Sequence, residues 1–420
     1  MYHTRFWSRS HVMAGALLAA LVLSPAGAAE LTVTGDHPFP APASAKAPAE
    51  LKADAAYVLV APDGTRRPAQ VDGGRIWWWS DGKTKDAALR IERSDSPLPE
   101  HVKVQQRGEG AIEVTIDGKP FTTLHFEEDA PKPYLWPVIG PTGDPVTRDF
   151  PMKDTEEEKS RKRQDHPHHR SLWTAHGDIR TPEHPDRGTD HWATDAVQDG
   201  KLVHRGRSGW QKVRRVVRTV SGPVFGLVEL EVDWTTVDGQ VEFSDTRVYR
   251  FFRGDENQRV FDYTLTFHFD RSDVTFADTK EGGLLAVRVA ISMDEVSKQG
   301  GYMVNSRGQK GMKECWGQPA EWCDYVGPVG EHTVGIAVFD APTNFRHPTR
   351  WHIRDYGLYT ANPFMARSVS RDNPDSSHTW KKGETATFNY RVLIHKGDTA
   401  AAGIADQYKA YAAGFDAPAK

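Results

Sequence analysis

The sequence has little cysteine and little net charge, and both shortages narrow what the protein can be. Only two of the 420 residues are cysteine, Cys315 and Cys323, which excludes a disulfide scaffold and leaves too few thiolates for a zinc site on their own. These two lie eight residues apart, so a local disulfide and two separate buried thiols both fit. The formal net charge of −4 gives no electrostatic reason to expect a nucleic acid or an anionic membrane as a partner.

Common catalytic motifs are also absent. The sequence contains no nucleophile elbow, no HExxH zinc motif, no CxxC pair and no glycine-rich phosphate loop. It therefore gives no sign of a serine hydrolase, a zinc protease, a thiol oxidoreductase or a nucleotide-binding enzyme. No cofactor is required by the sequence, although a divalent metal fits its histidine content.

Long apolar runs are missing except near the N-terminus. Arg5 and Arg9 precede an apolar run over 12–23, and 26–28 (AGA) matches a small-residue cleavage site. This pattern predicts a secretory signal peptide over 1–28, because the run is shorter than the ~20 residues that a membrane span needs. The mature protein is then exported, either periplasmic or secreted, with no membrane span. An uncleaved anchor is the alternative.

Residues 29–103 predict a small N-terminal β domain. Turn signals separate four short strand patterns, at Tyr57–Val60, Ala69–Val71, Ile76–Trp79 and Ala88–Glu92. The Pro/Ala-rich stretch 38–48 predicts a linker or an edge loop. For Trp77, Trp78 and Trp79 we expect two rings in a core and one at a domain contact, rather than an exposed platform for a sugar.

Residues 104–414 predict one large antiparallel β-sandwich, followed by a short tail over 415–420. The clearest strand is 261–270, where large apolar residues alternate strictly with polar ones. The other strand patterns are Ile112–Ile116, Phe121–Phe126, Leu227–Trp234, Glu242–Phe252, Val334–Phe339 and 386–394. Asp117-Gly118 predicts a hairpin. The one convincing helix comes last, with Thr399 as its cap and Ile404, Tyr408 and Tyr411 on one side.

The segment 140–164 predicts a loop outside the core. It holds Pro141, Gly143 and Pro145 and then a mixed-charge run over 154–163. A solvated loop and a mobile lid or rim over a site both fit this composition.

The densest chemical signal follows this loop. Six of the 18 histidines lie between residues 166 and 191, and 165–178 reads DHPHHRSLWTAHGD. Histidine takes or gives a proton near neutral pH and is the commonest metal ligand. Because Pro167 prevents a continuous helix, we expect the side chains of His168 and His169 to diverge.

Three further stretches combine reactive groups with turn residues. DTKEGG (278–283) places adjacent Lys and Glu at the end of a strand, where a carboxylate beside a cation stays ionised; an ordinary solvated turn fits equally. NFRHPTRWHIRDYGLYTANPF (344–364) carries two histidines and three arginines, and WGQPAEWCD (316–324) is an aromatic loop. The residues competent to bind a metal are His166, His168, His169, His176, His352 and Glu281.

Long phrases at 132–151, 165–178, 278–283, 344–364 and 390–398 resemble those of an exported bacterial family. That family carries the inherited label "methane oxygenase PmoA" and is otherwise of unknown function. The resemblance covers roughly residues 104–414. The label names a subunit that crosses the membrane several times. A chain with a mean hydropathy of −0.60 is too polar for that, so the label conflicts with this sequence.

A second resemblance concerns the fold. Lys382-Gly383-Glu384, leading into a strand that ends YRVLIH, resembles the close of galactose-mutarotase-like β-supersandwiches. Those domains bind carbohydrate in a groove and usually work with histidine and carboxylate residues. The resemblance therefore implies that the histidine stretch supplies an acid or base and Glu281 its carboxylate partner.

The sequence thus predicts an exported carbohydrate-active enzyme using His/Glu acid–base chemistry, with hydrolase, lyase and epimerase all open. A non-catalytic carbohydrate-binding protein and a metal-dependent oxidoreductase are the alternatives. The catalytic candidates are His168, His169, Lys280, Glu281 and His352. The substrate-binding candidates are His166, Arg170, Trp173, His176, Asp178, Arg354, Tyr356 and Asn362.

Overall fold

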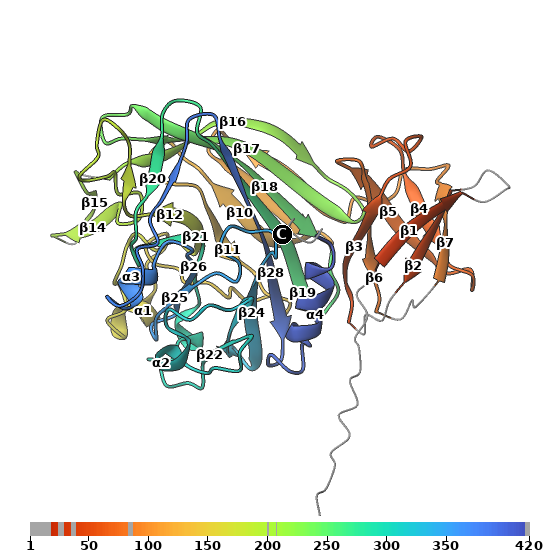
Figure 1. Ribbon diagram of the computed structural model, residues 1–420. Coiled ribbons are helices and arrows are strands. Elements are labelled where there is room, and N and C mark those ends of the chain that lie inside the picture. The colour runs from red at the N-terminus through yellow and green to blue at the C-terminus, as the bar shows by residue number, and fades with distance from the viewer. Residues whose placement is uncertain are drawn as a thin grey trace, which may run out of the picture.

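The computed structural model (Figure 1) describes residues 18–23, 29–34, 39–82, 87–199, 201–206 and 208–415. Arg5, Arg9 and the expected cleavage site at Ala28 lie outside the described residues. Part of the apolar run of the predicted signal peptide is described as β1 (Leu18–Leu23), which pairs with β2 (Ala29–Thr34). Among the described residues no helix is long and apolar enough to cross a membrane.

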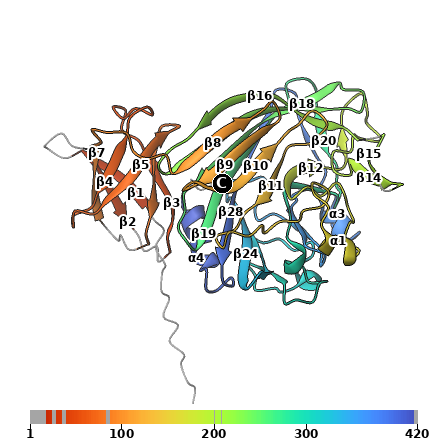
Figure 2. The ribbon, with the colours of Figure 1, turned by 180° about the vertical axis from the view of Figure 1, so that it is seen from behind.

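The first seven strands form one antiparallel sheet, seen in red and orange at one side of Figures 1 and 2. In spatial order they are β1, β2, β7 (Ala87–Arg93), β4 (Tyr57–Val60), β5 (Arg66–Asp72), β6 (Arg75–Ser80) and β3 (Ala41–Lys46). The predicted linker or edge loop at 38–48 is therefore corrected to an edge strand, β3. Alternate residues Ala41, Ala43 and Ala45 are buried, and small side chains allow this strand to lie close on its neighbours.

The three consecutive tryptophans of β6 divide between two cores. Trp78 is buried in the core of the N-terminal sheet, whereas Trp77 and Trp79 pack against an apolar cluster of the following sandwich. One ring lies in the core and two at the contact, the reverse of the predicted division. Neighbouring residues of a strand point to opposite faces, so the central ring necessarily parts from the other two.

Two eight-stranded antiparallel sheets form the rest of the molecule. The first contains, in order, β25 (Trp351–Ile353), β26 (Leu358–Ala361), β21 (Gly282–Arg288), β12 (Leu172–His176), β11 (Tyr134–Val138), β10 (Lys119–His125), β9 (Ala111–Ile116) and β8 (Val102–Arg107). The second contains β16 (Trp210–Val220), β17 (Phe225–Thr235), β18 (Val241–Phe252), β19 (Gln258–His268), β28 (Thr385–Lys396), β24 (His332–Asp340), β23 (Trp322–Val329) and β22 (Tyr302–Asn305).

The two large sheets face each other across one continuous apolar core. Phe121 of β10 meets Phe251 of β18 across that core at 5.9 Å between ring centroids, and the Thr174 and Tyr263 hydroxyls join β12 to β19 at 2.8 Å. The predicted alternation of β19 and β28 and the hairpin at Asp117-Gly118 are present. The expected mainly β fold, a large antiparallel sandwich preceded by small β structure and closed by a short helix, is confirmed.

Smaller elements complete the described part of the chain. They are the strands β13 (Ile179–Arg180), β20 (Val274–Phe276), β27 (His378–Trp380), β14 (Asp195–Gln198) and β15 (Lys201–His204), and the helices α1 (Glu156–Ser160), η1 (Ile291–Met293), α2 (Met312–Cys315), α3 (Ala366–Val369) and α4 (Ile404–Ala412). Gly403, and not Thr399, precedes α4; the Thr399 hydroxyl bonds Asp324 instead. Ile404 and Tyr411 are buried as expected, and both cysteines are free, buried thiols.

The charged segment before the histidines is anchored to the sandwich. Thr155 caps α1, and the α1 residue Glu158 is buried with its carboxylate accepting from the Phe150 N–H at 3.1 Å. Arg163 pairs with the buried carboxylate of Asp294. The prediction of a solvated loop holds for most of this run, which is exposed on both sides of Glu158. Only Glu158 and Arg163 turn toward the sandwich, through these contacts.

Candidate functional site

The histidine stretch enters the core through a turn that ends at β12. His166 and Ser171 have left-handed backbone angles, with φ of 46° and 57°, and the His169 N–H donates to the His166 carbonyl at 3.0 Å. This turn brings the rings of His168 and His169 together, 4.5 Å apart and edge to face. The expectation that they diverge is therefore wrong, because the turn replaces the extended backbone on which neighbouring side chains alternate.

Aromatic rings surround these imidazoles. The His169 ring stacks on Trp173 at 5.3 Å and meets the edge of Trp192 at 5.3 Å. His166 stacks on the His169 ring at 4.9 Å and on Tyr356 at 4.8 Å. Trp192 therefore lies at the centre of this group of rings. Sequence reasoning did not single it out, and the one signal that could have found it was its position next to His191 in the histidine-rich window.

The Trp192 indole also lies beside the sequence stretch 344–364. The Trp192 ring lies 6.3 Å from His352 on β25, and His352 meets Trp316 edge to face at 5.0 Å. The Arg354 guanidinium covers the Trp316 ring at 4.2 Å. We call His166, His168, His169, Trp192, His352 and Tyr356 the histidine cluster. Residues about 180 positions apart in the chain meet here because β12 and β25 belong to one sheet.

Lys280 and Glu281 lie at the same place. They directly precede β21, whose Gly282 pairs with His176 of β12. Their side chains form an ion pair of 2.5 Å and are 42% and 43% exposed. Burial is the main cause that lowers the pKa of His352, with the charges of Arg354 and Lys280 adding to it, and burial is the main cause that raises the pKa of Tyr356, with the charge of Glu281 adding to it. The structure therefore brings the predicted catalytic groups together, with Lys280, Glu281, His166, Tyr356, Arg354 and Trp316 partly exposed.

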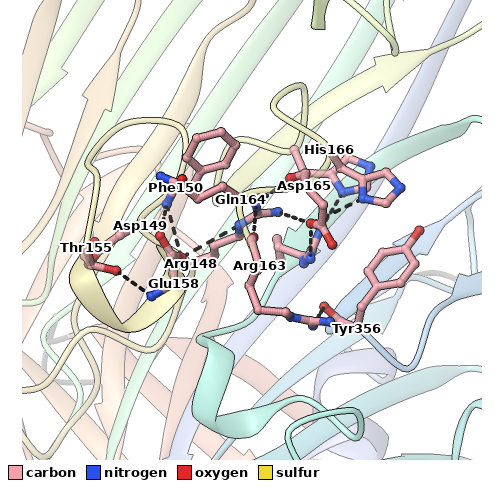
Figure 3. Close-up of polar contacts among 12 residues, drawn as sticks. Arg148, Asp149, Phe150, Thr155, Glu158, Arg163, Gln164, Asp165, His166 and Tyr356 are labelled. Atoms are coloured by element: carbon pink, nitrogen blue, oxygen red, sulfur yellow. Dashed lines mark hydrogen bonds and ion pairs between the residues drawn. The ribbon is translucent and has the colours of Figure 1, made fainter. Parts of the chain in front are cut away.

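A network of charged side chains holds the turn that carries His166, His168 and His169 in place. Arg288 on β21 donates to His169 Nδ1 and to Asp165 Oδ1, both at 2.9 Å, and its guanidinium lies 4.6 Å from the centre of the Tyr356 ring. Arg148 pairs with Asp165 at 3.0 Å and donates to its backbone carbonyl. Figure 3 shows Arg148 and Asp165 between α1 and His166. Sequence reasoning missed both arginines, because nothing local marks Arg288 in its strand or Arg148 in its loop as turned inward.

This network sets protonation states. Because an arginine can only donate, His169 Nδ1 accepts and the ring proton lies on Nε2. Burial opposes ionisation of Asp165, but its hydrogen bond with His166 and the charges of Arg288 and Arg148 hold the Asp165 pKa well below its ordinary value. Burial lowers the pKa of His168 to about 2 and those of His169 and His352 well below the ordinary value. These three imidazoles are neutral at physiological pH.

Several buried nitrogens in and beside the cluster have no hydrogen-bond partner among the described residues. Among them are His168 Nδ1, both ring nitrogens of His352, Trp173 Nε1 and Trp192 Nε1. The Lys280 backbone lies near enough to His352 to favour its protonated form, but no hydrogen bond of normal geometry joins them. Unpaired buried donors are uncommon in native proteins, and a group of them in one place needs an explanation.

Four of the predicted substrate-binding residues already have protein partners. The Arg170 guanidinium pairs with the buried Asp195 at 3.1 Å, and His176 Nε2 lies 2.9 Å from the Ala277 carbonyl. Burial lowers the pKa of His176 to about 4. Asp178 binds Arg180 at 2.6 Å. Asn362 donates to the Thr279 carbonyl at 2.9 Å, which ties the Lys280 turn to the end of β26.

The metal-competent residues do not assemble into a ligand set. Within the part of the chain that the structure describes, no group of three or more His, Cys, Asp or Glu side chains is arranged to hold a metal ion. His166, His168 and His169 instead stack face to face or edge to face, whereas metal ligands point their nitrogens at one centre.

Comparison with known proteins gives a family and a distant structural similarity. Residues 111–409, more than half of the chain, match the model described as "Family of unknown function (DUF6807)"; that description mentions neither methane nor an oxygenase. No curated protein matches the sequence. A crystal structure from Escherichia coli K12, named "Putative aldose 1-epimerase", aligns with 70% of this chain and 99% of its own at 7% identity and a TM-score of 0.29. This similarity is too distant to equate individual residues.

Proposed function

The chain belongs to the family of unknown function DUF6807, and we propose that it is an exported carbohydrate-active enzyme whose substrate binds at the histidine cluster. Export is proposed from the sequence of residues 1–28 alone. N-terminal sequencing of the protein recovered from outside the cytoplasm, beginning near residue 29, tests that part. An intact N-terminus would contradict cleavage, and protein found only in the cytoplasm would contradict export.

The observation that carries the proposal is the set of unpaired nitrogens beside aromatic rings. Each buried polar group without a partner costs roughly 1–3 kcal/mol, so a ligand group or ordered water that reaches these nitrogens would bind favourably. A sugar offers many hydroxyls and also an apolar C–H face that packs on aromatic rings such as Trp316 and Tyr356. Few other small molecules combine both features.

The lowered pKa values of the buried histidines exclude them from proton transfer in this proposal. A general acid or base works best with a pKa near the working pH, and His168, at about 2, is far below it. We therefore assign His168, His169 and His352 to hydrogen bonding as neutral imidazoles. Proton transfer falls to His166 and Glu281, which are partly exposed and lie beside Asp165 and Lys280 respectively.

This pair favours a lyase or an isomerase. Hydrolysis usually employs two carboxyl groups on either side of the scissile bond, whereas one imidazole and one carboxylate suit removal of a proton and its return at another position. Arg354, held over Trp316, then binds a hydroxyl or carboxylate of the substrate.

The test is a panel of free sugars and glycosides assayed for change of optical rotation, release of reducing ends and formation of unsaturated products. His166→Asn and Glu281→Gln are each expected to lower kcat by about 10²–10⁴-fold. His332→Asn, an exposed histidine at the start of β24, is the matched control and keeps full activity. Both site variants turning over at the wild-type rate would refute the assignment.

A carbohydrate-binding protein without catalysis is the second candidate. The neutral state of the three buried histidines favours it, because binding needs no tuned proton donor. In that case wild type binds a sugar, no substrate of the panel is turned over, and His166→Asn binds as tightly as wild type.

A further inference from the structure

A cavity of about 270 Å³ lies between the N-terminal sheet and the sandwich. Strands β3 and β6 form one wall, β18, β19 and β28 form another, and the end of α4 closes it. None of its lining residues belongs to the histidine cluster. Ligand sites are common at such junctions between folded units, and known small-molecule sites start at roughly 300 Å³, so this cavity suits a single ring.

The walls of the cavity are held in place by polar contacts between the two units. Asp72 of β5 pairs with Arg218 at 2.6 Å and with Arg250 at 2.5 Å. The Gln70 amide oxygen accepts from the backbone N–H groups of Val224 and Phe225, both at 3.2 Å. Because Asp72 and Gln70 are buried, the junction is a packed contact, and the cavity is a fixed feature of it.

Three arginines and four aromatic residues are among the groups that line the cavity. The Arg250 guanidinium lies 4.2 Å from the centre of the Trp77 ring, and the Arg391 guanidinium lies 4.7 Å from that of Tyr411. Asp72 neutralises Arg250, and Asp262 neutralises Arg391 at 2.6 Å.

One cation in the lining remains without a carboxylate. Arg75 bonds only the Ser44 hydroxyl at 3.0 Å and the Ser44 carbonyl at 3.3 Å, and no carboxylate partner is found for it in the described ranges. An arginine fork pairs well with a planar carboxylate. The cavity therefore carries one positive charge that a ligand can match.

Two further lining groups lack partners. The Tyr411 hydroxyl is buried, its residue 5% exposed, and it makes no hydrogen bond with any described residue. The Arg250 Nε atom is also buried and makes no hydrogen bond with any described residue. Neither atom is accessible from the cavity as it stands, so a ligand hydroxyl pairs with each only after a small shift of its side chain. The face of Trp77 supplies an apolar surface beside them.

We propose that this cavity is a second small-molecule site, and that it takes a hydroxylated ring with one carboxylate, of the uronic acid class. Arg75 binds the carboxylate, Tyr411 and Arg250 bind ring hydroxyls, and Trp77 packs on the ring face. The proposal shares no residue with the histidine cluster and stands whether or not that cluster is catalytic.

Calorimetric titration of the full chain with glucuronate tests the proposal, with tryptophan fluorescence as a second readout because Trp77 lies in the wall. Glucuronate is expected to bind saturably, glucose at least tenfold more weakly because it lacks the carboxylate, and acetate not measurably because it lacks the ring. Arg75→Gln is expected to raise the Kd at least tenfold and Tyr411→Phe about threefold to tenfold, the loss of one hydrogen bond.

Two controls locate the site. Arg66→Gln removes an exposed arginine of the same sheet that pairs with Glu92, and Glu281→Gln removes a group of the histidine cluster; both are expected to leave the Kd unchanged. Absence of saturable glucuronate binding, equal binding of acetate, or an unchanged Kd in Tyr411→Phe would each overturn the proposal. Loss of binding in Glu281→Gln would also overturn it, by moving the ligand to the histidine cluster without refuting the function proposed there.

Discussion

Removing Arg288 gives the sharpest test of how the histidine turn is held. Arg288 is 2% exposed and donates one hydrogen bond to Asp165 and one to His169, each of 2.9 Å. Deleting one partner of a buried ion pair costs about 3–5 kcal/mol, because the other charge is left unpaired. Here the Asp165 side chain is 33% exposed and Arg148 still pairs with it, so Arg288→Met is expected to lower the free energy of unfolding by about 2 kcal/mol, below that range.

Urea unfolding at neutral pH, followed by circular dichroism, measures the effect. Arg214→Met is the control, because its pair with Glu231 is exposed and such pairs contribute about 0–1 kcal/mol. Combining Arg288→Met with Asp165→Asn gives a double-mutant cycle, with an expected coupling of about 1–3 kcal/mol.

The pH dependence supplies an independent check on the same contact. The folded pKa of Asp165 lies below its unfolded value. The pair's contribution is therefore complete above about pH 4, the unfolded pKa of an aspartate, and is lost as the pH falls further. A loss below 1 kcal/mol in Arg288→Met, or zero coupling at neutral pH, would refute the role of Arg288.

Three further predictions concern single sites. His352→Phe removes two buried nitrogens that lack partners, so we expect the free energy of unfolding to rise by about 1–3 kcal/mol while sugar turnover or binding falls; a less stable variant in urea unfolding would contradict this. Burial lowers the pKa of Lys132 to about 7, so the folded state binds fewer protons than the unfolded state between about pH 7 and 10.4 and Lys132 makes stability rise with pH there. Lys132→Met should remove that rise, and an unchanged slope of thermal midpoint against pH would contradict it. A Cβ at Gly188 would lie 2.1 Å from the Ile179 carbonyl oxygen, so Gly188→Ala should destabilise by about 1–3 kcal/mol, checked by urea unfolding against Gly206→Ala, where a Cβ meets no atom within 4 Å.

The sequence by itself determined eleven of the 28 strands that the structure describes. Strict alternation marked β19 and β28, because a strand between a core and solvent must alternate its side chains. Turn residues marked the β9–β10 hairpin, where Asp117 and Gly118 both take positive φ. Where this local signal was weak, as in the Ala/Pro-rich β3, the strand was missed. Backbone pairing with β6 makes this segment a strand.

The location of the candidate site was also readable in the sequence, as a surplus of histidine followed by two distant polar stretches. Its internal arrangement was not. The facing of His168 and His169, the central place of Trp192 and the bond from Arg288 all depend on β12, β21 and β25 lying in one sheet. Side chains far apart in the chain meet only through that pairing, and it sets the burial that keeps these imidazoles neutral. Composition could therefore indicate where reactive side chains are concentrated, but only the tertiary structure shows which of them are buried and which stay partly exposed.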